Sequence, residues 1–486
     1  MTWRWTLAVG VAVFGAGAQR ERAEWVRVQT VGTSVPTQGM GTDSLGRYQA
    51  LADSLIDAAL RDSTGYHRLG ALVDGFGSRL SGSRSLEQAI DWVLGEMRRD
   101  GLANVRGERV MVPHWERGAE SAMLVAPRRV ALHVLGLGGT VGTPAGGLTA
   151  PVLVVRTFDD LRARAAEARG RIVLFDIPWD TALDPSSAYD ALTSYRYRAP
   201  AAAARVGAVG VLIRSLTPVS MQSPHTGGTA YDSASRRLPI AAVSVEDAAM
   251  LHRMQDRGTR VVVRLTLSGR TLPDAASRNV VGELVGRERP DEVVVLGGHI
   301  DSWDVGEGAM DDGGGAVAAW EAVRLMARLG LRPRRTVRVV LWTNEENGGR
   351  GMRAYRDAHR TALNQHMLAI ESDDGVFSPR GFVFTGSDSG AGTLGGIGHL
   401  LDRIGAGRIT RGDADGDLEA LAPLGVPAAR LDVDPSRYYW YHHSASDTFS
   451  VIDAGEMARC VAALAVTAFV AADMTDAMPR TRATVP

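Results

Sequence analysis

Cysteine is almost absent from this 486-residue sequence, which has a single one, Cys460. No disulfide can therefore form within the chain. Cys460 lies in the apolar stretch MARCVAALAVTAFVAADM, which indicates a thiol buried in a helical core. Lysine is absent altogether, and we attach no function to this because arginine supplies the same surface charge.

Neither sign of charge is in excess, because 54 basic residues face 55 acidic ones. A chain with so little net charge creates no field that would attract nucleic acid or an anionic membrane. Hydrophobic residues make up 45% of the chain and charged residues 22%, which is typical of soluble globular domains and excludes a disordered or fibrous protein. The length predicts two or three domains.

A long hydrophobic run is also missing at the N-terminus. The apolar segment from Thr6 to Ala16 is shorter than the ~20 residues that a membrane-spanning helix needs. An arginine precedes this segment and the small residues AGA end it, a pattern typical of a secretory signal peptide. We expect residues 1–18 to be removed after Ala18, so that the mature protein is secreted or periplasmic and has no membrane anchor.

The pattern of apolar residues divides the rest of the chain. Residues 44–99 show helical spacing, and Gly101 follows as a helix-ending signal. Strand-like runs such as GRIVLFDI and RVVVRLTL then alternate with short helical segments, as in an inserted β-rich α/β domain. From Asn279 onward strands and helices alternate regularly, which predicts a three-layer α/β/α domain with a mixed, largely parallel sheet. The expected division is 1–18 (signal peptide), 19–127 (first part of the main domain), 128–272 (insert), 273–475 (second part) and 476–486 (tail).

Three predicted strands end in acidic or imidazole side chains. The pairs are His299 with Asp301, Glu345 with Glu346, and Asp373 with Asp374. Because functional residues of an open α/β sheet gather beyond the carboxyl ends of its strands, these groups are expected to share one crevice. So many carboxylates would repel one another and take up protons unless cations neutralised them. Imidazole among carboxylates favours zinc, with manganese or cobalt as less specific fits.

The spacing within these motifs indicates different roles. His299 and Asp301 lie on one face of an extended chain, so the carboxylate can hold the far nitrogen of a metal-binding imidazole. Glu345 and Glu346 point in different directions, and one can bind metal while the other serves as a base. Asp311, in the glycine-rich GAMDDGGG, has two carboxylate oxygens that could bridge a pair of ions.

Other interpretations fit these motifs less well. Each motif alone is commonly a surface turn or a glycine linker. DSWDVG is no EF-hand loop, because Trp303 stands where an oxygen ligand is required. The sequence has no G-x-S-x-G nucleophile elbow, and GLGGTVG lacks the glycine spacing of a dinucleotide site. The joint occurrence of the acidic motifs, in order and after strands, favours a metal centre.

These motifs together resemble those of a known family. The series H-x-D, G-A-x-D-D, E-E, E-S-D and H-S-x-x-D-T is carried by GGHIDSWDVGEGAMDDGGG, WTNEENGG, ESDDG and YYWYHHSASDTF. It is similar to that of the co-catalytic zinc aminopeptidases, above all the plasma glutamate carboxypeptidase (carboxypeptidase Q) type. The resemblance spans most of the mature chain. It implies that the α/β/α domain is a zinc peptidase domain, that GSRLSGSRSLEQAIDW is its N-terminal segment, and that residues 128–272 form a protease-associated insert.

The resemblance also implies a role for each matching residue. It implies two zinc ions, with Glu345 as the general base and a cis peptide bond after the bridging aspartate. The implied positions are His299 and Asp373 on one ion, Glu346 and His443 on the other, Asp311 bridging, and Asp301 and Asp447 as supporting carboxylates. Many relatives place a tyrosine directly before the last histidine ligand to stabilise the oxyanion. This chain has His442 there and Tyr441 one residue earlier, so the helper is left open between them. The other histidines are expected at the surface or in packing roles: His67, His114, His133, His225, His252, His359, His366 and His399.

The predicted function is that of an exported di-zinc exopeptidase that hydrolyses dipeptides or short peptides with a free N-terminus. A zinc carboxypeptidase, a glutaminyl cyclase with one zinc ion, and an inactive binding protein on the same fold are the alternatives. From the family, the insert is expected to shape the mouth of the cleft or to form a contact between subunits of a homodimer.

Overall fold

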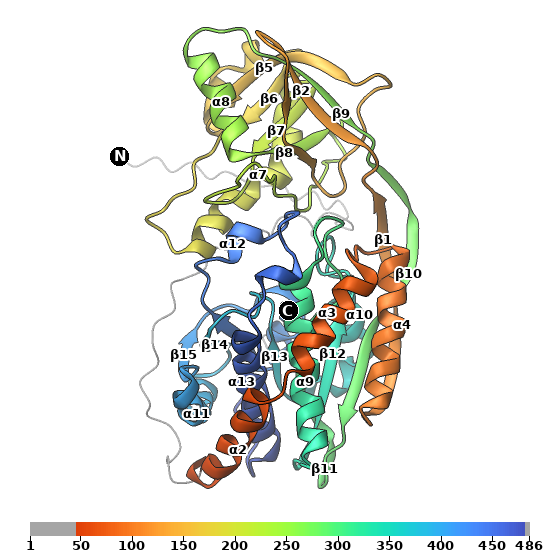
Figure 1. The fold of residues 1–486 in the computed structure, drawn as a ribbon, viewed down its shortest axis with the longest axis vertical. Helices are drawn as coiled ribbons and strands as arrows, with labels where there is room; N and C mark the ends of the chain where they lie inside the picture. Colours follow the sequence, from red (N-terminus) through yellow and green to blue (C-terminus); the bar gives the residue numbers. More distant parts are fainter. Residues whose placement is uncertain (1–44, 482–486) are drawn as a thin grey trace, which may run out of the picture.

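The computed structural model describes residues 45–481 and contains two eight-stranded sheets, drawn one above the other in Figure 1. The predicted signal peptide lies outside the described residues. The lower sheet is built from both ends of the described chain. Residues 117–269 lie between two of its strands and form the upper sheet with its helices; we call them the insert.

The lower sheet is mixed, and its parallel strands lie at its centre. Its strands are β1 (Ala103–Glu116), β10 (Arg270–Leu284), β11 (Arg289–His299), β12 (Arg335–Trp342), β13 (His366–Glu371), β14 (Pro379–Thr385), β15 (Arg408–Arg411) and β16 (Ala428–Val433). They are ordered β1-β10-β12-β11-β13-β16-β14-β15. The run β12-β11-β13-β16 is parallel, as is β14-β15, and the other pairs are antiparallel. The predicted α/β fold class is therefore confirmed.

Helices cover both faces of the lower sheet. They are α2 (Gln49–Leu60), α3 (Thr64–Phe76), α4 (Arg84–Arg99), α9 (Gly314–Arg328), α10 (Arg350–Ala358), α11 (Asp388–Gly398), α12 (Tyr438–Tyr441) and α13 (Ala454–Asp473). The shorter helical turns are η1 (Gly46–Tyr48), η2 (Ala309–Gly313), η3 (Arg360–Gln365), η4 (His399–Ile404), η5 (Gly416–Leu418), η6 (Ala422–Leu424) and η7 (Phe449–Val451). In β11, Val294 and Leu296 pack with α9 and α13, whereas Val293 and Val295 pack with α10 on the opposite face. The run VVVL is apolar throughout because both faces of this strand are buried in a three-layer arrangement.

The helix α4 shows how local sequence signals set element bounds. The Ser83 side chain accepts a hydrogen bond from the Leu86 backbone N–H at 3.2 Å and caps the first turn. The helix ends at Arg99, and Gly101 follows with φ of 75°, a conformation that glycine adopts without penalty. The expected helix and its stop signal are both present.

The most apolar helix is a core element. Among the described residues, α13 is the one helix that is long and apolar enough to cross a membrane by length and composition. Most of its length is nevertheless buried, and it packs against α2 and α9. Cys460 is fully buried within it, as expected for a core thiol.

The insert has a second three-layer arrangement. Its strands are β2 (Glu120–Ala126), β3 (Val130–Leu132), β4 (Val134–Gly136), β5 (Leu148–Val155), β6 (Ile172–Phe175), β7 (Gly210–Arg214), β8 (Ile240–Val243) and β9 (Val262–Leu267), ordered β3-β2-β9-β5-β6-β7-β8-β4. Its helices are α5 (Phe158–Ala163), α6 (Ala165–Ala168), α7 (Pro185–Arg205) and α8 (Val245–Asp256). The strand β2 pairs with β9 and so joins this sheet, although it precedes residue 128, where the sequence places the start of the insert.

One helix of the insert is longer than the sequence indicates. The sequence predicts only short helical segments in the insert, whereas α7 runs from Pro185 to Arg205, and the Asp184 side chain before it accepts a hydrogen bond from Ser187 N–H at 3.1 Å. Pro200 lies inside it. The additional turns, rich in serine and tyrosine, carry side chains toward the lower domain.

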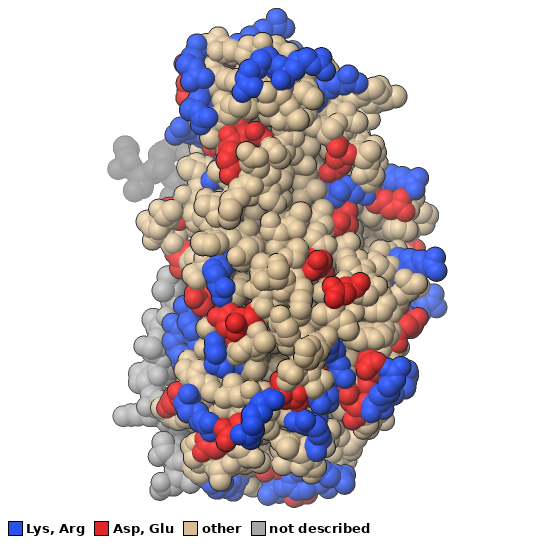
Figure 2. Space-filling model, viewed as in Figure 1, with Lys and Arg blue, Asp and Glu red and all other residues tan. Residues whose placement is uncertain are grey.

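Both signs of charge are spread over the surface. On the face shown in Figure 2, arginines gather at the outer end of the insert, whereas basic and acidic side chains are intermixed over the lower domain. This distribution agrees with a net charge of −1.

Candidate metal centre and active site

The predicted acidic motifs meet at one edge of the lower sheet. β11 lies between β12 and β13, and the three strands are parallel. His299 ends β11, Glu345 and Glu346 follow β12, and Asp373 follows β13. Neighbouring parallel strands end at the same edge, so side chains that are far apart in the sequence become neighbours.

One group of side chains is centred on His299. Its Nε2 lies 3.2 Å from Asp311 Oδ1 and 3.0 Å from Asp373 Oδ1. Its Nδ1 lies 2.9 Å from the backbone oxygen of Asp301. Because a carbonyl oxygen only accepts, Nδ1 carries a proton, and Nε2 is the nitrogen that a metal between it and the two carboxylates would bind. This tautomer is the one that a metal-binding histidine uses.

A second group is centred on His443. Its Nε2 lies 3.2 Å from Asp311 Oδ2 and 3.1 Å from Glu346 Oε2. The His442 ring stacks on the His443 ring with centroids 3.6 Å apart, and its Nε2 lies 3.5 Å from Asp311 Oδ2. Asp311 therefore presents one carboxylate oxygen to each group.

The loop that carries Asp311 is held by Asp447. The Asp447 carboxylate accepts hydrogen bonds from the backbone N–H groups of Ala309, Met310 and Asp311, at 3.1, 2.7 and 3.2 Å. The peptide bond between Asp311 and Asp312 is cis, as the family resemblance implies. Asp447 thus supports the Asp311 position through the backbone, and within the described part of the chain it forms no hydrogen bond or ion pair with a histidine ring.

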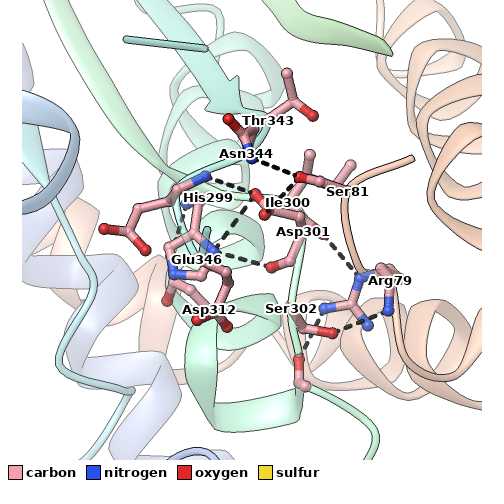
Figure 3. Close-up of polar contacts among 12 residues, drawn as sticks. Arg79, Ser81, His299, Ile300, Asp301, Ser302, Asp312, Thr343, Asn344 and Glu346 are labelled. Carbon is pink, nitrogen blue, oxygen red and sulfur yellow. Dashed lines mark hydrogen bonds and ion pairs between the residues drawn. The ribbon is translucent and has the colours of Figure 1, made fainter. Parts of the chain in front are cut away.

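Asp301 connects the histidine to the base through a polar network drawn in Figure 3. Its carboxylate accepts hydrogen bonds from Glu345 N–H at 3.1 Å and from the Ser81 hydroxyl at 3.2 Å. Arg79 lies beside it with no exposed surface and donates to the Ile300 and Gly308 carbonyls at 2.9 and 2.8 Å. The sequence identifies the segment that contains Arg79 and Ser81 but does not predict their contacts, because the composition of GSRLSGS is typical of a loop.

The charge of this cluster calls for a cation. Burial, with repulsion from Asp373 and Asp301, raises the pKa of Glu345 to about 8, against the attraction of His299. Burial also raises the pKa of Asp373 to about 6 and, with repulsion from Asp311, raises the pKa of Glu346. The buried Asp311 Oδ2 accepts no hydrogen bond although it lies beside His443. Imidazole and carboxylate atoms in contact without a hydrogen bond fit a zinc-binding donor set.

The sequence leaves open whether His442 or Tyr441 would stabilise the oxyanion, and the two side chains differ in burial and in contacts. His442 is buried and faces Asp311, whereas Tyr441 is half-buried and packs against the core. A tyrosine that the sequence did not single out, Tyr438, also reaches the site and donates from its hydroxyl to the Asp373 carbonyl at 3.2 Å. Its ring lies 4.9 Å from the His442 ring.

The insert contributes an arginine that sequence reasoning missed. Arg196 on α7 is 2% exposed and donates from Nη1 to the Tyr189 hydroxyl at 2.5 Å. Its Nε and Nη2 have no hydrogen-bond partner. The Tyr189 ring in turn stands edge-on to His442 with centroids 4.9 Å apart. Burial lowers the pKa of His443, and the charge of Arg196 adds to this effect against the attraction of Asp311.

Comparisons with known proteins agree with this geometry. The sequence profile of Peptidase family M28 matches residues 279–468. Carboxypeptidase Q of Mus musculus is 43% identical over 441 residues, which cover 90% of this chain and 92% of that protein. Carboxypeptidase Q of Homo sapiens is 43% identical over 415 residues, which cover 85% of this chain and 86% of that protein.

Solved structures show the same fold. A peptidase M28 precursor from Shewanella amazonensis SB2B superposes with a TM-score of 0.86 at 33% identity and covers 90% of this chain and 99% of its own. A zinc aminopeptidase from Bacillus subtilis superposes with a TM-score of 0.63 at 18% identity, covering 85% of this chain and 95% of its own, which supports the fold alone. From the extent of these matches, and from the imidazole and carboxylate donors gathered at the strand ends, the chain belongs to peptidase family M28 and is a zinc-dependent hydrolase.

Proposed function

We propose that this protein is a di-zinc exopeptidase that hydrolyses dipeptides or short peptides with a free N-terminus. The observation that carries the proposal is Asp311, whose two oxygens face two separate histidine-centred groups. His299 and Asp373 would hold one ion, and Glu346 and His443 the other. Of the carboxylates proposed as metal ligands, His442 lies near Asp311 alone, at 3.5 Å, so we assign it to the substrate oxyanion and not to the metal.

Glu345 is the proposed base. Zinc ions at such a centre act as Lewis acids on the scissile carbonyl and lower the pKa of a bound water. The Glu345 backbone N–H is held by Asp301, and among the described residues its carboxylate forms no ion pair or hydrogen bond that would occupy it. Its carboxylate would take the proton of the attacking water and pass it to the leaving amine.

Replacing Glu345 by glutamine tests this assignment. We expect Glu345→Gln to abolish dipeptide hydrolysis while zinc content, measured by elemental analysis, stays at two ions per chain. Wild-type turnover in this variant would refute the base assignment. A wild-type content of one zinc ion per chain would instead favour the glutaminyl cyclase alternative.

A carboxypeptidase or strict dipeptidase is the second candidate, because of Arg196. A buried guanidinium with two unpaired donors is costly unless an anion binds it. The C-terminal carboxylate of a peptide is planar and suits a two-donor contact of this kind. Carboxypeptidase Q, the relative named above, is a carboxypeptidase by its name. We propose that Arg196 binds the substrate carboxylate. The distance from Arg196 to the metal centre would then determine which peptide bond is hydrolysed.

Blocking either end of a dipeptide separates the two candidates. If Arg196 binds the carboxylate, amidation of the C-terminus raises KM roughly 10- to 100-fold, the value of a charge-assisted hydrogen bond. Arg196→Met should raise KM for the free dipeptide by as much and leave the amide unchanged, and Arg196→Lys serves as the charge-retaining control. Equal rates on free and amidated dipeptides would refute the proposal that Arg196 binds the substrate carboxylate. If only N-acetylation slows hydrolysis, the enzyme is an aminopeptidase.

Export remains a proposal from the sequence of residues 1–18. Mass spectrometry of the protein from its native host should find a mature chain that begins at Gln19.

A further inference from the structure

A loop of the insert is hydrogen-bonded along the segment that carries His443. The Thr217 hydroxyl donates to the Tyr439 carbonyl at 2.5 Å. The Thr226 backbone N–H donates to the His443 carbonyl at 2.8 Å, and His225 forms an antiparallel β-bridge with Ser444. Two parts of the chain more than 200 residues apart thus share a short stretch of backbone pairing.

His225 adds a side-chain bond to this pairing. Its Nδ1 lies 2.6 Å from the His442 carbonyl oxygen, which only accepts, so Nδ1 is the donor. Its Nε2 has no partner, and the residue is 1% exposed. A hydrogen bond closed off from water in this way cannot be replaced by solvent when it is lost.

The backbone at His443 needs such support. His443 has φ of 60°, in the left-handed region that residues with a side chain seldom adopt. Sparsely populated conformations of this kind persist only where the surroundings enforce them. The carbonyls on both sides of this turn, those of His442 and His443, are bonded to His225 and Thr226 of the insert. The lower domain adds bonds at the Tyr441 carbonyl, from Ser444 N–H at 3.1 Å and from the Ser444 hydroxyl at 2.7 Å, but among the described residues it donates none to the His442 or His443 carbonyl.

We propose that His225 is a positioning residue for the metal centre: its bond to the His442 carbonyl holds His443 at Asp311 and Glu346. This inference rests on the proposed function, which assigns His443 to one of two ions. The insert would then complete half of the metal centre, the half built on Glu346 and His443. Among residues 45–481, no hydrogen bond or ion pair joins His299 or Asp373 to the insert, so this half would bind its ion without the insert.

Two matched substitutions at position 225 test the hydrogen bond. His225→Phe keeps a ring of similar size and removes the donor, whereas His225→Asn keeps a donor at the position of Nδ1. Full-length proteins are dialysed against graded concentrations of a chelator, and zinc per chain is measured. We expect His225→Phe to release one of its two ions at roughly 10- to 100-fold lower chelator concentration, the usual cost of losing a supporting contact of a ligand. We expect His225→Asn to follow the wild type.

Several results would overturn the proposal. Wild-type zinc retention in His225→Phe would do so, as would equal loss in His225→Asn, because packing and not the hydrogen bond would then be responsible. Loss of both ions together would show a general effect on the fold. If His225→Phe fails to fold, Thr217→Val against Thr217→Ser repeats the comparison at Tyr439. A wild-type protein that binds fewer than two zinc ions would refute the proposed function itself, which is a separate outcome.

Discussion

At the scale of single residues, the Arg79 side chain holds several backbone carbonyls in place. Its guanidinium donates to four carbonyls, those of Gly77, Ile300, Glu307 and Gly308, at 2.8 to 2.9 Å. The loop between β11 and η2 therefore keeps its shape without regular secondary structure. This loop joins His299 to Asp311, so the two groups of proposed metal ligands depend on it.

Replacing Arg79 should destabilise the protein strongly. Arg79→Met removes a donor from four carbonyls, of which those of Ile300 and Gly308 are buried, and we expect a loss of about 3 kcal/mol or more in the free energy of unfolding. Arg79→Lys should recover only part of this, because one ammonium cannot reproduce a planar fork. Urea unfolding followed by tryptophan fluorescence measures the difference. Arg162→Met, at a 70% exposed side chain, is the matched control, and an equal effect of both substitutions would contradict the role of Arg79.

At the scale of secondary-structure elements, Asp62 ties the turn before α3 to α9. Its carboxylate accepts from Thr64 N–H and from the Thr64 hydroxyl at 2.9 and 2.6 Å and pairs with Arg324 at 2.5 Å. Burial opposes ionisation, but the bonds from Thr64 and the charge of Arg324 lower the pKa of Asp62 to about 2. A carboxyl whose pKa is lower in the folded state stabilises the fold above its unfolded pKa and loses this effect as the pH falls.

The consequence is a pH-dependent effect of Asp62→Asn. We expect this variant to be less stable by about 1 kcal/mol at pH 7, a value reduced for partial screening by solvent. The difference should shrink below about pH 4 and vanish toward pH 2. Thermal unfolding at several pH values measures it. Asp159→Asn, at an 80% exposed side chain, should show no such trend, and a constant difference for Asp62→Asn across the range would refute the explanation.

Element by element, the sequence predicts the central sheet well and one helix of the insert poorly. The strands β11, β12 and β13 are apolar runs that end in charged motifs, so both their place and their functional ends follow from periodicity. The helix α7 begins with PSSAYDALTSYRYR, which has no clear apolar period, and Pro200 suggests a break where none exists. Tyr189 and Arg196 lie on that unpredicted part. Their approach to His442 depends on a tertiary contact that no local pattern encodes.

At the scale of the whole molecule, the site lies where the two domains meet. His225 is expected from the sequence at the surface or in packing, whereas it is buried and bonded to the His442 carbonyl. An isolated histidine gives no sign of this, because its partner is a backbone oxygen 217 residues away. The motifs of the proposed metal site can be predicted from the sequence, because their chemistry depends on residue type. Supporting contacts to backbone atoms cannot be predicted in this way, because almost any polar residue can make them.

Gly138 of the insert packs closely against Trp303 of the lower domain. A Cβ built on Gly138 would lie 1.9 Å from Trp303 Cζ3, which is far inside contact distance. Trp303 cannot retreat freely, because its backbone N–H donates to Glu346 Oε1 at 3.1 Å and its ring centroid lies 5.6 Å from that of His443. Gly138→Ala should therefore separate the domains or displace Glu346. Overpacking of this kind costs about 1–3 kcal/mol.

We expect Gly138→Ala to lower the midpoint of thermal unfolding and to weaken dipeptide hydrolysis together, because the added methyl group acts on the domain contact and on Glu346 at once. Calorimetry and an activity assay measure both. Gly75→Ala is the control, because a Cβ at this position of α3 meets no atom within 4 Å, and alanine is the better helix former by about 1 kcal/mol. Wild-type stability and activity in Gly138→Ala would mean that the domains tolerate a wider gap, and that the metal centre does not depend on their close fit.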